Sequence, residues 1–194
     1  MSTFPDFFLN PRTTSQQRLA SHLREYAVRT DGPFTLRSGA TSDWYIDARQ
    51  TTFDGDGAVL VGQAVADVLD REVTAVGGLT MGADPIAVAT AIASAAGGRS
   101  LKSFSVRKEA KSHGVGGRIV GPVGEDDVVA VLEDTTTTGS AVFEAIEALT
   151  EAGIRIAQVI TLVDRSAGSA AAKVDAVGIP YVALITPADL GVTE

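Results

Sequence analysis

The sequence predicts an α/β fold in which helices cover both faces of a central parallel sheet, with a small appendage at the N-terminus. Short β-branched and apolar runs recur without strict alternation, which is typical of strands buried on both faces. Alanine-rich stretches with helical spacing separate most of these runs, and this alternation favours a parallel sheet. The predicted strands are residues 73–76, 101–106, 128–132, 154–163 and 181–185.

Two helices between these strands are well marked in the sequence. They are predicted at residues 85–96 and 140–152, and both stretches are rich in alanine. Gly153 follows the second in the position where many helices end, because glycine readily adopts the left-handed conformation needed there. Each helix therefore connects two consecutive strands of the predicted sheet.

The first 50 residues have a different pattern. A helix is predicted from Thr14 to about residue 28, because Thr14 and Gln17 have the spacing of a capping box. Residues 34–36 and 44–47 are predicted to form a pair of short strands. We expect this region to be an appendage on the main sheet.

The length and composition limit the class of protein. A chain of 194 residues with 45% hydrophobic residues is long enough for one well-buried domain and short for two, so residues 1–194 are expected to form a single domain. The absence of cysteine excludes disulfides and cysteine-bearing metal or thiol sites. No signal-like segment begins the chain, and no run approaches the roughly 18 apolar residues of a membrane span. We expect a soluble, cytoplasmic protein.

The net charge limits the partners that the protein is expected to bind. With 16 Lys and Arg against 24 Asp and Glu, the net charge is -8, which disfavours binding to nucleic acid or to an anionic membrane. An anionic ligand would therefore have to be held by a local cluster of donors.

Polar segments follow four of the predicted strands. Because the carboxyl ends of parallel strands meet at one edge of a sheet, where ligands bind, we expect these segments to lie together. They are residues 77–85, 107–114, 133–140 and 164–165.

The third segment has the composition of a phosphate site. Glu133 and Asp134 follow a buried strand, and a run of threonines, Gly139 and Ser140 then leads into a helix. Backbone N–H groups at a helix start, aided by the helix dipole, bind phosphate. The two carboxylates can accept hydrogen bonds from sugar hydroxyls. The alternative is that these residues only cap the helix in a solvated loop.

The second segment concentrates cations in an acidic chain. Arg107, Lys108, Lys111 and His113 precede a glycine-containing stretch that would suit a lid over a leaving diphosphate. The alternative interpretation is a solvated basic loop.

These two segments resemble known motifs. Residues 133–141 are similar to the PRPP-binding signature of type I phosphoribosyltransferases, and residues 107–117 closely resemble the catalytic loop of the orotate phosphoribosyltransferase family. The resemblance implies that Lys111 is the main catalytic residue and that Arg107, Lys108 and His113 contact the diphosphate. The PRPP-binding residues that it implies are Arg37, Glu133, Asp134, Thr135, Thr136, Thr137, Thr138, Gly139, Ser140 and Ala141.

The N-terminal region extends the resemblance. Residues 32–39 and 42–47 are similar to the hood that covers orotate in this family, so residues 1–50 are expected to form an N-terminal helix and a base-covering hood. The residues that the resemblance assigns to orotate are Arg165, Thr137, Tyr45 and Ile46.

Two departures from the family pattern stand out. Arg37 replaces the usual lysine, which keeps the charge but changes the reach. Thr80 and Met81 stand where many members have Tyr-Lys, so a cationic contact to the pyrophosphate is missing there.

The resemblance implies transfer of the phosphoribosyl group of PRPP to orotate, with Mg2+ as cofactor and no metal ligand assigned to the protein. In the family the basic loop often serves the neighbouring subunit, which implies a homodimer with shared active sites. Two alternatives stay open: an enzyme of the same superfamily acting on another base, and a non-catalytic regulator that senses PRPP.

Overall fold

The structure is a computed structural model that describes residues 14–35, 39, 41–111 and 117–193, the side chains of residues 110 and 111 excepted. Its centre is a six-stranded sheet in the order β10-β9-β8-β5-β6-β7. All neighbouring strands are parallel except β7, which pairs antiparallel with β6 at one edge. The predicted parallel sheet is thus confirmed, with one antiparallel edge strand added. The strands are β5 (Ala75–Leu79), β6 (Lys102–Lys111), β7 (Gly117–Val120), β8 (Val128–Thr136), β9 (Arg155–Asp164) and β10 (Tyr181–Ile185).

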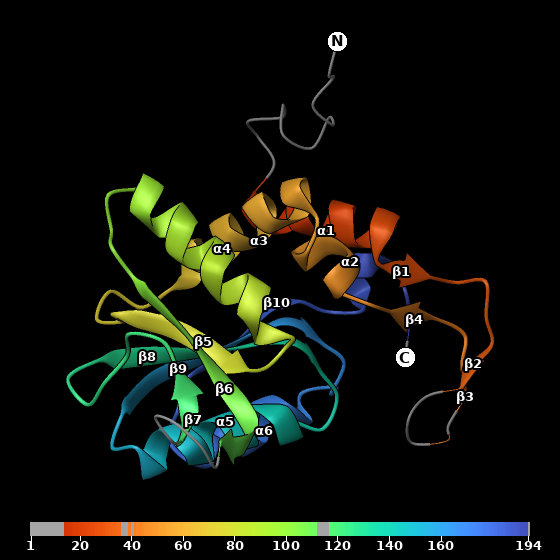
Figure 1. Cartoon of the computed structure of the whole chain (residues 1–194). Helices are drawn as coiled ribbons and strands as arrows, with labels where there is room; N and C mark the ends of the chain where they lie inside the picture. Colours follow the sequence, from red (N-terminus) through yellow and green to blue (C-terminus); the bar gives the residue numbers. More distant parts are fainter. Residues whose placement is uncertain (1–13, 36–38, 40, 112–116, 194) are drawn as a thin grey trace.

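Helices cover both faces of this sheet (Figure 1). On one face lie α1 (Ser15–Tyr26), α2 (Arg49–Thr52), α3 (Gly55–Val68) and α4 (Ala83–Ala96). On the other lie α5 (Ser140–Glu151) and α6 (Ser169–Asp175). A 3-10 turn, η2 (Ala188–Leu190), follows β10, and its Leu190 belongs to the core of the first face. None of the described helices has the length and apolar character that crossing a membrane requires.

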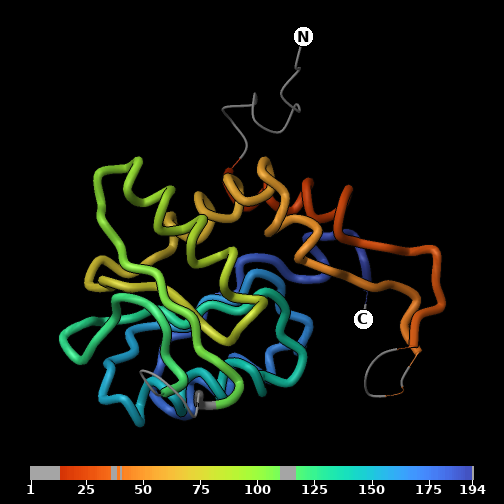
Figure 2. The backbone as a smooth tube through the Cα atoms, viewed as in Figure 1, coloured from red at the N-terminus to blue at the C-terminus, as the bar shows by residue number. Residues whose placement is uncertain are grey.

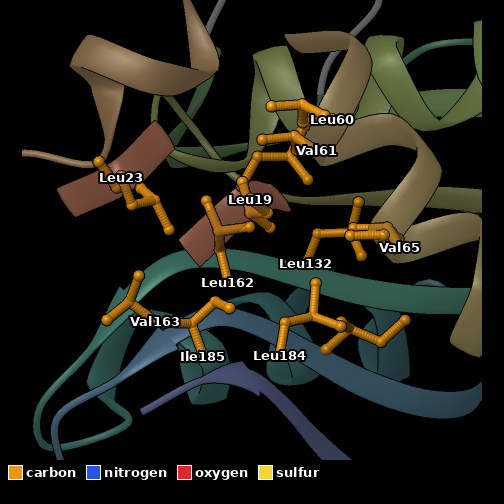
Figure 3. Close-up of a cluster of buried hydrophobic side chains, with 14 of the residues drawn as sticks. Leu19, Leu23, Leu60, Val61, Val65, Leu132, Leu162, Val163, Leu184 and Ile185 are labelled. Carbon is orange, nitrogen blue, oxygen red and sulfur yellow. The ribbon is translucent and has the colours of Figure 1, made fainter. Parts of the chain in front are cut away.

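Each face has its own apolar core. Figure 3 shows the first, where leucines and valines of α1 and α3 meet side chains of β8, β9 and β10. Leu19, Leu60 and Leu132 are among its fully buried members. The second core joins α5 to the opposite face of the sheet through residues such as Val131 and Leu149. Strands buried on both sides explain why their sequence shows apolar runs without alternation.

Several sheet strands run further than the sequence predicts. β5 includes Gly77 and Gly78, which have low intrinsic strand preference but lie in the middle of a parallel ladder. A Cβ added at Gly78 would stand 2.1 Å from the carbonyl oxygen of Leu132 and 2.8 Å from the Cβ of Ala83. Glycine there lets β8 and α4 approach closely. Tertiary pairing thus overrides local propensity.

The appendage contains strands, but the predicted pairing of residues 34–36 with residues 44–47 is wrong. Instead β1 (Val28–Arg29) pairs with β4 (Tyr45–Ile46), and β2 (Phe34–Thr35) pairs with β3 (Thr41–Ser42). The two ladders belong to one long hairpin that is interrupted near Gly32 and Pro33. Proline lacks an N–H group, so a continuous ladder cannot pass through it.

The helix starts follow the sequence more closely. The Thr14 hydroxyl accepts from the Gln17 N–H, and the Gln17 side chain accepts from the Thr14 N–H, so the predicted capping box is confirmed. Gly153 has φ 70° just beyond α5, as predicted. Helix α3 was not predicted, because its three glycines weaken the helical pattern.

The C-terminal end of the described chain lies beside the appendage (Figure 2). The Trp44 indole nitrogen donates a hydrogen bond of 3.0 Å to the carbonyl oxygen of Thr193. This contact joins segments that are 149 positions apart in the sequence.

Candidate active site

The carboxyl ends of β5, β6 and β8 meet at a pocket with a volume of about 430 Å3. Three of the four polar segments predicted to share one edge of the sheet line this pocket, namely residues 77–85, 107–114 and 133–140. Arg49 of α2 lines it as well. The described lining residues are Arg49, Leu79, Thr80, Met81, Gly82, Lys108, Glu133, Asp134 and Ala141. The fourth segment adjoins the end of β8, where the N–H of Arg165 donates to the carbonyl of Thr136.

Two adjacent acids line the pocket, of which Glu133 is buried and Asp134 is half-buried. The Glu133 side chain is 8% exposed. Burial, followed by the neighbouring charge of Asp134, raises the pKa of Glu133 to about 8. Burial also raises the pKa of Asp134, whose carboxylate accepts a 2.6 Å hydrogen bond from the Thr135 N–H. The sequence predicts two carboxylate acceptors, and the structure adds that burial disfavours the charged form of Glu133.

This shifted pKa predicts a pH-dependent stability. A folded-state pKa of about 8, above the ordinary 4.5, means that the contribution is fully present below 4.5 and is lost as pH rises through about 8. We expect the melting temperature to fall by several degrees over this window, and Glu133→Gln to remove much of that slope. Calorimetric scans of both proteins across the same buffers measure the difference. Parallel curves would show that Glu133 titrates normally.

Gly82 permits the close approach of one acid. It precedes α4 with ordinary helical φ, so its backbone does not require glycine. A Cβ added there would instead stand 2.7 Å from Cγ and 2.8 Å from Oδ1 of Asp134. The carboxylate is the movable end of its side chain, so a larger residue would turn it away from its present position.

We therefore predict that Gly82→Ala weakens PRPP binding by about tenfold, the cost of one misplaced charged hydrogen-bond acceptor, with little loss of stability. Isothermal calorimetry with PRPP and a thermal melt give the two values. Gly124→Ala is the matched control, because an added Cβ there meets nothing within 4 Å. Unchanged PRPP affinity in Gly82→Ala would show that the position of Asp134 is unimportant.

The basic residues are distributed unevenly. Lys108 lines the pocket, and its charge opposes the rise in the pKa of Glu133. Arg107 is half-buried and lies outside the described lining, and its carbonyl accepts from the Arg118 guanidinium at 3.0 Å. Lys111 ends β6, but its side chain lies outside the described part of the structure. His113 and Arg37 lie outside the described residues altogether.

The predicted phosphate loop joins β8 to α5. Gly139 has φ 84°, a left-handed conformation that favours glycine, and it directly precedes the helix. The hydroxyls of Thr138 and Ser140 are 2.8 Å apart, and Thr137 is exposed beside them. Thr136 differs, because its buried hydroxyl bonds to that of Thr161 at 3.2 Å. Its side chain therefore belongs to the sheet interior.

Lys173 forms a hydrogen bond with the backbone of this loop. Its ammonium group on α6 donates to the carbonyl of Thr138 at 2.8 Å. No sequence pattern predicts this role, since Lys173 lies in an alanine-rich stretch remote from the motif.

Arg165 contacts the hood. Its guanidinium carbon lies 3.8 Å from the centroid of the Trp44 ring, and Trp44 is only 3% exposed. This cation–π contact holds the guanidinium plane at a fixed place. Tyr45 is 38% exposed, whereas Ile46 is 6% exposed and belongs to the core. Only the backbone of Ile46 is therefore available to a ligand.

Comparison with known proteins shows the family of this chain. No family model matches the chain. It is 44% identical over 180 residues to the orotate phosphoribosyltransferase of Streptomyces coelicolor, a match that spans 92% of this chain and 98% of that relative. The chain belongs to the orotate phosphoribosyltransferase family. The family that the sequence motifs predict is thereby confirmed.

Solved structures from this family share the fold. The Mycobacterium tuberculosis orotate phosphoribosyltransferase in complex with Fe(III) dicitrate superimposes with a TM-score of 0.83 at 37% identity, covering 92% of this chain and 100% of that one. The same enzyme in complex with PRPP gives a TM-score of 0.78 at 33% identity, with coverage of 92% and 100%. The type I phosphoribosyltransferase fold is confirmed.

Proposed function

We propose that the chain catalyses transfer of the 5-phosphoribosyl group of PRPP to orotate, giving orotidine 5'-monophosphate and pyrophosphate in the synthesis of UMP. The observation that carries this proposal is the pocket lined together by Glu133, Asp134 and Lys108, with Ala141 at the start of α5. Membership of the orotate phosphoribosyltransferase family supports the choice of reaction.

The parts of PRPP match the parts of this pocket. The 5-phosphate would bind N–H groups and hydroxyls of residues 135–141 at the start of α5, where the helix dipole favours an anion. The ribose hydroxyls would face Glu133 and Asp134. The diphosphate would then extend toward Lys108 and the loop containing Thr80 and Met81. One ligand with two anionic ends and a diol between them would satisfy all three regions.

Catalysis would consist mainly of positioning and charge neutralisation. The bond between C1 of the ribose and the diphosphate oxygen breaks as N1 of orotate bonds to C1 from the opposite face, and N1 loses its proton. Negative charge grows on the departing diphosphate, and preorganised cations there lower the barrier. We assign this role to Lys111 with Arg107, Lys108 and His113, as the family resemblance implies.

We propose that Arg165 recognises orotate. Its planar guanidinium matches a carboxylate and a ring carbonyl in one plane. The Trp44 ring, which lies against the guanidinium group, would keep that plane from turning. Thr137, exposed Tyr45 and the backbone of Ile46 complete the proposed base site, with residues 1–50 as the helix and hood that cover it.

Magnesium fits the donors of the pocket. The described residues contain no group of three or more His, Asp or Glu side chains that could hold a metal ion. Mg2+ often uses one or two carboxylates together with phosphate oxygens and water, and Asp134 lines the pocket where it could supply one. We propose Mg2+ as cofactor, held mainly by PRPP. When bound it would neutralise charge on the diphosphate.

The deciding experiment is orotate-dependent release of pyrophosphate from PRPP in the presence of Mg2+. Adenine, guanine and uracil, offered in place of orotate, test the alternative of another base. PRPP binding without turnover on any base would favour the alternative of a PRPP-sensing regulator. We expect turnover with orotate alone.

We also propose a cytoplasmic homodimer with shared active sites. Large apolar side chains are exposed on α3, α4 and their adjoining segments, namely Phe53, Val59, Met81, Val88 and Ile92. Val88 and Ile92 are four positions apart on α4 and so lie on one face of that helix. Exposed apolar side chains that share a helix face are suited to an interface with another chain. A second copy of the chain would bury them, and sedimentation measures the resulting mass.

A further inference from the structure

We infer that Arg49 is a substrate-contacting residue that binds the diphosphate of PRPP, an inference that rests on the proposed function. Arg49 begins α2, directly after the hood strand β4. It lines the same pocket as Thr80, Lys108 and Asp134. Neither the basic loop nor the phosphate loop contains it.

The charges of the pocket require a cation at this place. Glu133 and Asp134 line the pocket, and the neighbouring side chains of Thr80 and Met81 are uncharged. A diphosphate attached to a ribose held by those acids would be repelled by the negative charge of Asp134. Among the described lining residues, Arg49 and Lys108 supply positive charge, one from the appendage and the other from the sheet. Arg49 lies close enough to Asp134 to oppose the rise in its pKa.

The local hydrogen bonds hold the guanidinium in a useful orientation. The carboxylate of Asp47 accepts from the Arg49 backbone N–H at 3.2 Å and from its Nε at 2.7 Å. Gln50 donates to the other Asp47 oxygen at 3.3 Å. These bonds engage Nε, so the terminal nitrogens can form the two-pronged contact that guanidinium makes with phosphate. Asp47 is thus a positioning residue for Arg49.

A contact with the diphosphate can be separated from a purely structural pairing of Arg49 with Asp134. Pyrophosphate contains the diphosphate without the sugar, whereas ribose 5-phosphate contains the sugar without the diphosphate. We propose to measure the dissociation constants of both, with Mg2+ present, for the wild type, Arg49→Gln, Arg49→Lys and Arg155→Gln. Arg155 is the matched control, because it is an exposed arginine paired with Glu72 at the opposite end of the sheet strands.

We expect Arg49→Gln to weaken pyrophosphate binding by about tenfold or more, the range for a charge-assisted contact, and to leave ribose 5-phosphate binding unchanged. Arg49→Lys keeps the charge and should lose about half of that effect on a logarithmic scale. Arg155→Gln should match the wild type. The KM for PRPP should rise in parallel with the loss of pyrophosphate affinity.

Equal weakening of both ligands would overturn the inference, because it would mean that Arg49 acts through Asp134 and the sugar. No change in either ligand, or weakening of ribose 5-phosphate alone, would overturn it as well. If Arg49→Gln does not melt cooperatively, the same comparison in Arg49→Lys decides. Failure of the proposed function is a separate result, since it would appear as an inactive wild type.

Discussion

Replacing Lys111 with alanine should lower the turnover number by about a hundredfold or more, the scale seen when one preorganised charge-stabilising group is removed. The family resemblance assigns this lysine the main catalytic role, and the structure places its backbone at the end of β6, three positions beyond the pocket residue Lys108. The substitution keeps the backbone groups through which β6 pairs, so the melting temperature should change little. Steady-state pyrophosphate release and a thermal melt measure the two effects.

The variant Lys111→Arg, which preserves the charge, tests whether the positive charge itself is needed for turnover. Lys111→Arg should recover part of the lost turnover, because it retains a cation that can meet the departing diphosphate. A higher KM for PRPP with an unchanged turnover number would instead assign Lys111 to binding. Turnover of the alanine variant within about twofold of wild type would contradict the catalytic assignment.

The phosphate loop could be predicted because all its determinants are adjacent in the sequence. A buried strand, the acids Glu133 and Asp134, a run of hydroxyls and Gly139 determine the turn, the helix start and the ligand chemistry together. The sequence could not show that burial raises the pKa of Glu133 to about 8, because that shift depends on what packs around the carboxyl group.

The residues that sequence analysis missed reach the site by tertiary packing. Arg49 comes from a four-residue helix, and Lys173 comes from the far side of the phosphate loop. Trp44 was part of the hood motif, but only the structure shows its ring against Arg165. The error in strand pairing within the hood has a related cause, because short strands are placed by their partners more than by their own composition.

Two inactive variants should restore activity when mixed, if the active sites are shared between subunits. Lys111→Ala lacks the proposed catalytic cation. Gly139→Trp places a large side chain at a position with φ 84°, where any L residue is strained, and should disable the phosphate loop. In a shared site, Lys111 of one chain would complete the phosphate loop of its partner. A heterodimer of the two variants would then contain one site built from two intact halves.

The size of the recovery tests the arrangement. Random exchange between equal amounts of the two variants yields about half heterodimers, each with one working site of two, so activity should approach about a quarter of wild type. Subunit exchange is verified separately with two differently tagged copies, and Lys111→Ala mixed with itself is the control. If exchange is demonstrated and no activity returns, Lys111 acts within its own chain. The exposed apolar residues of α3 and α4 would then belong to an interface between two chains, each with its own complete active site.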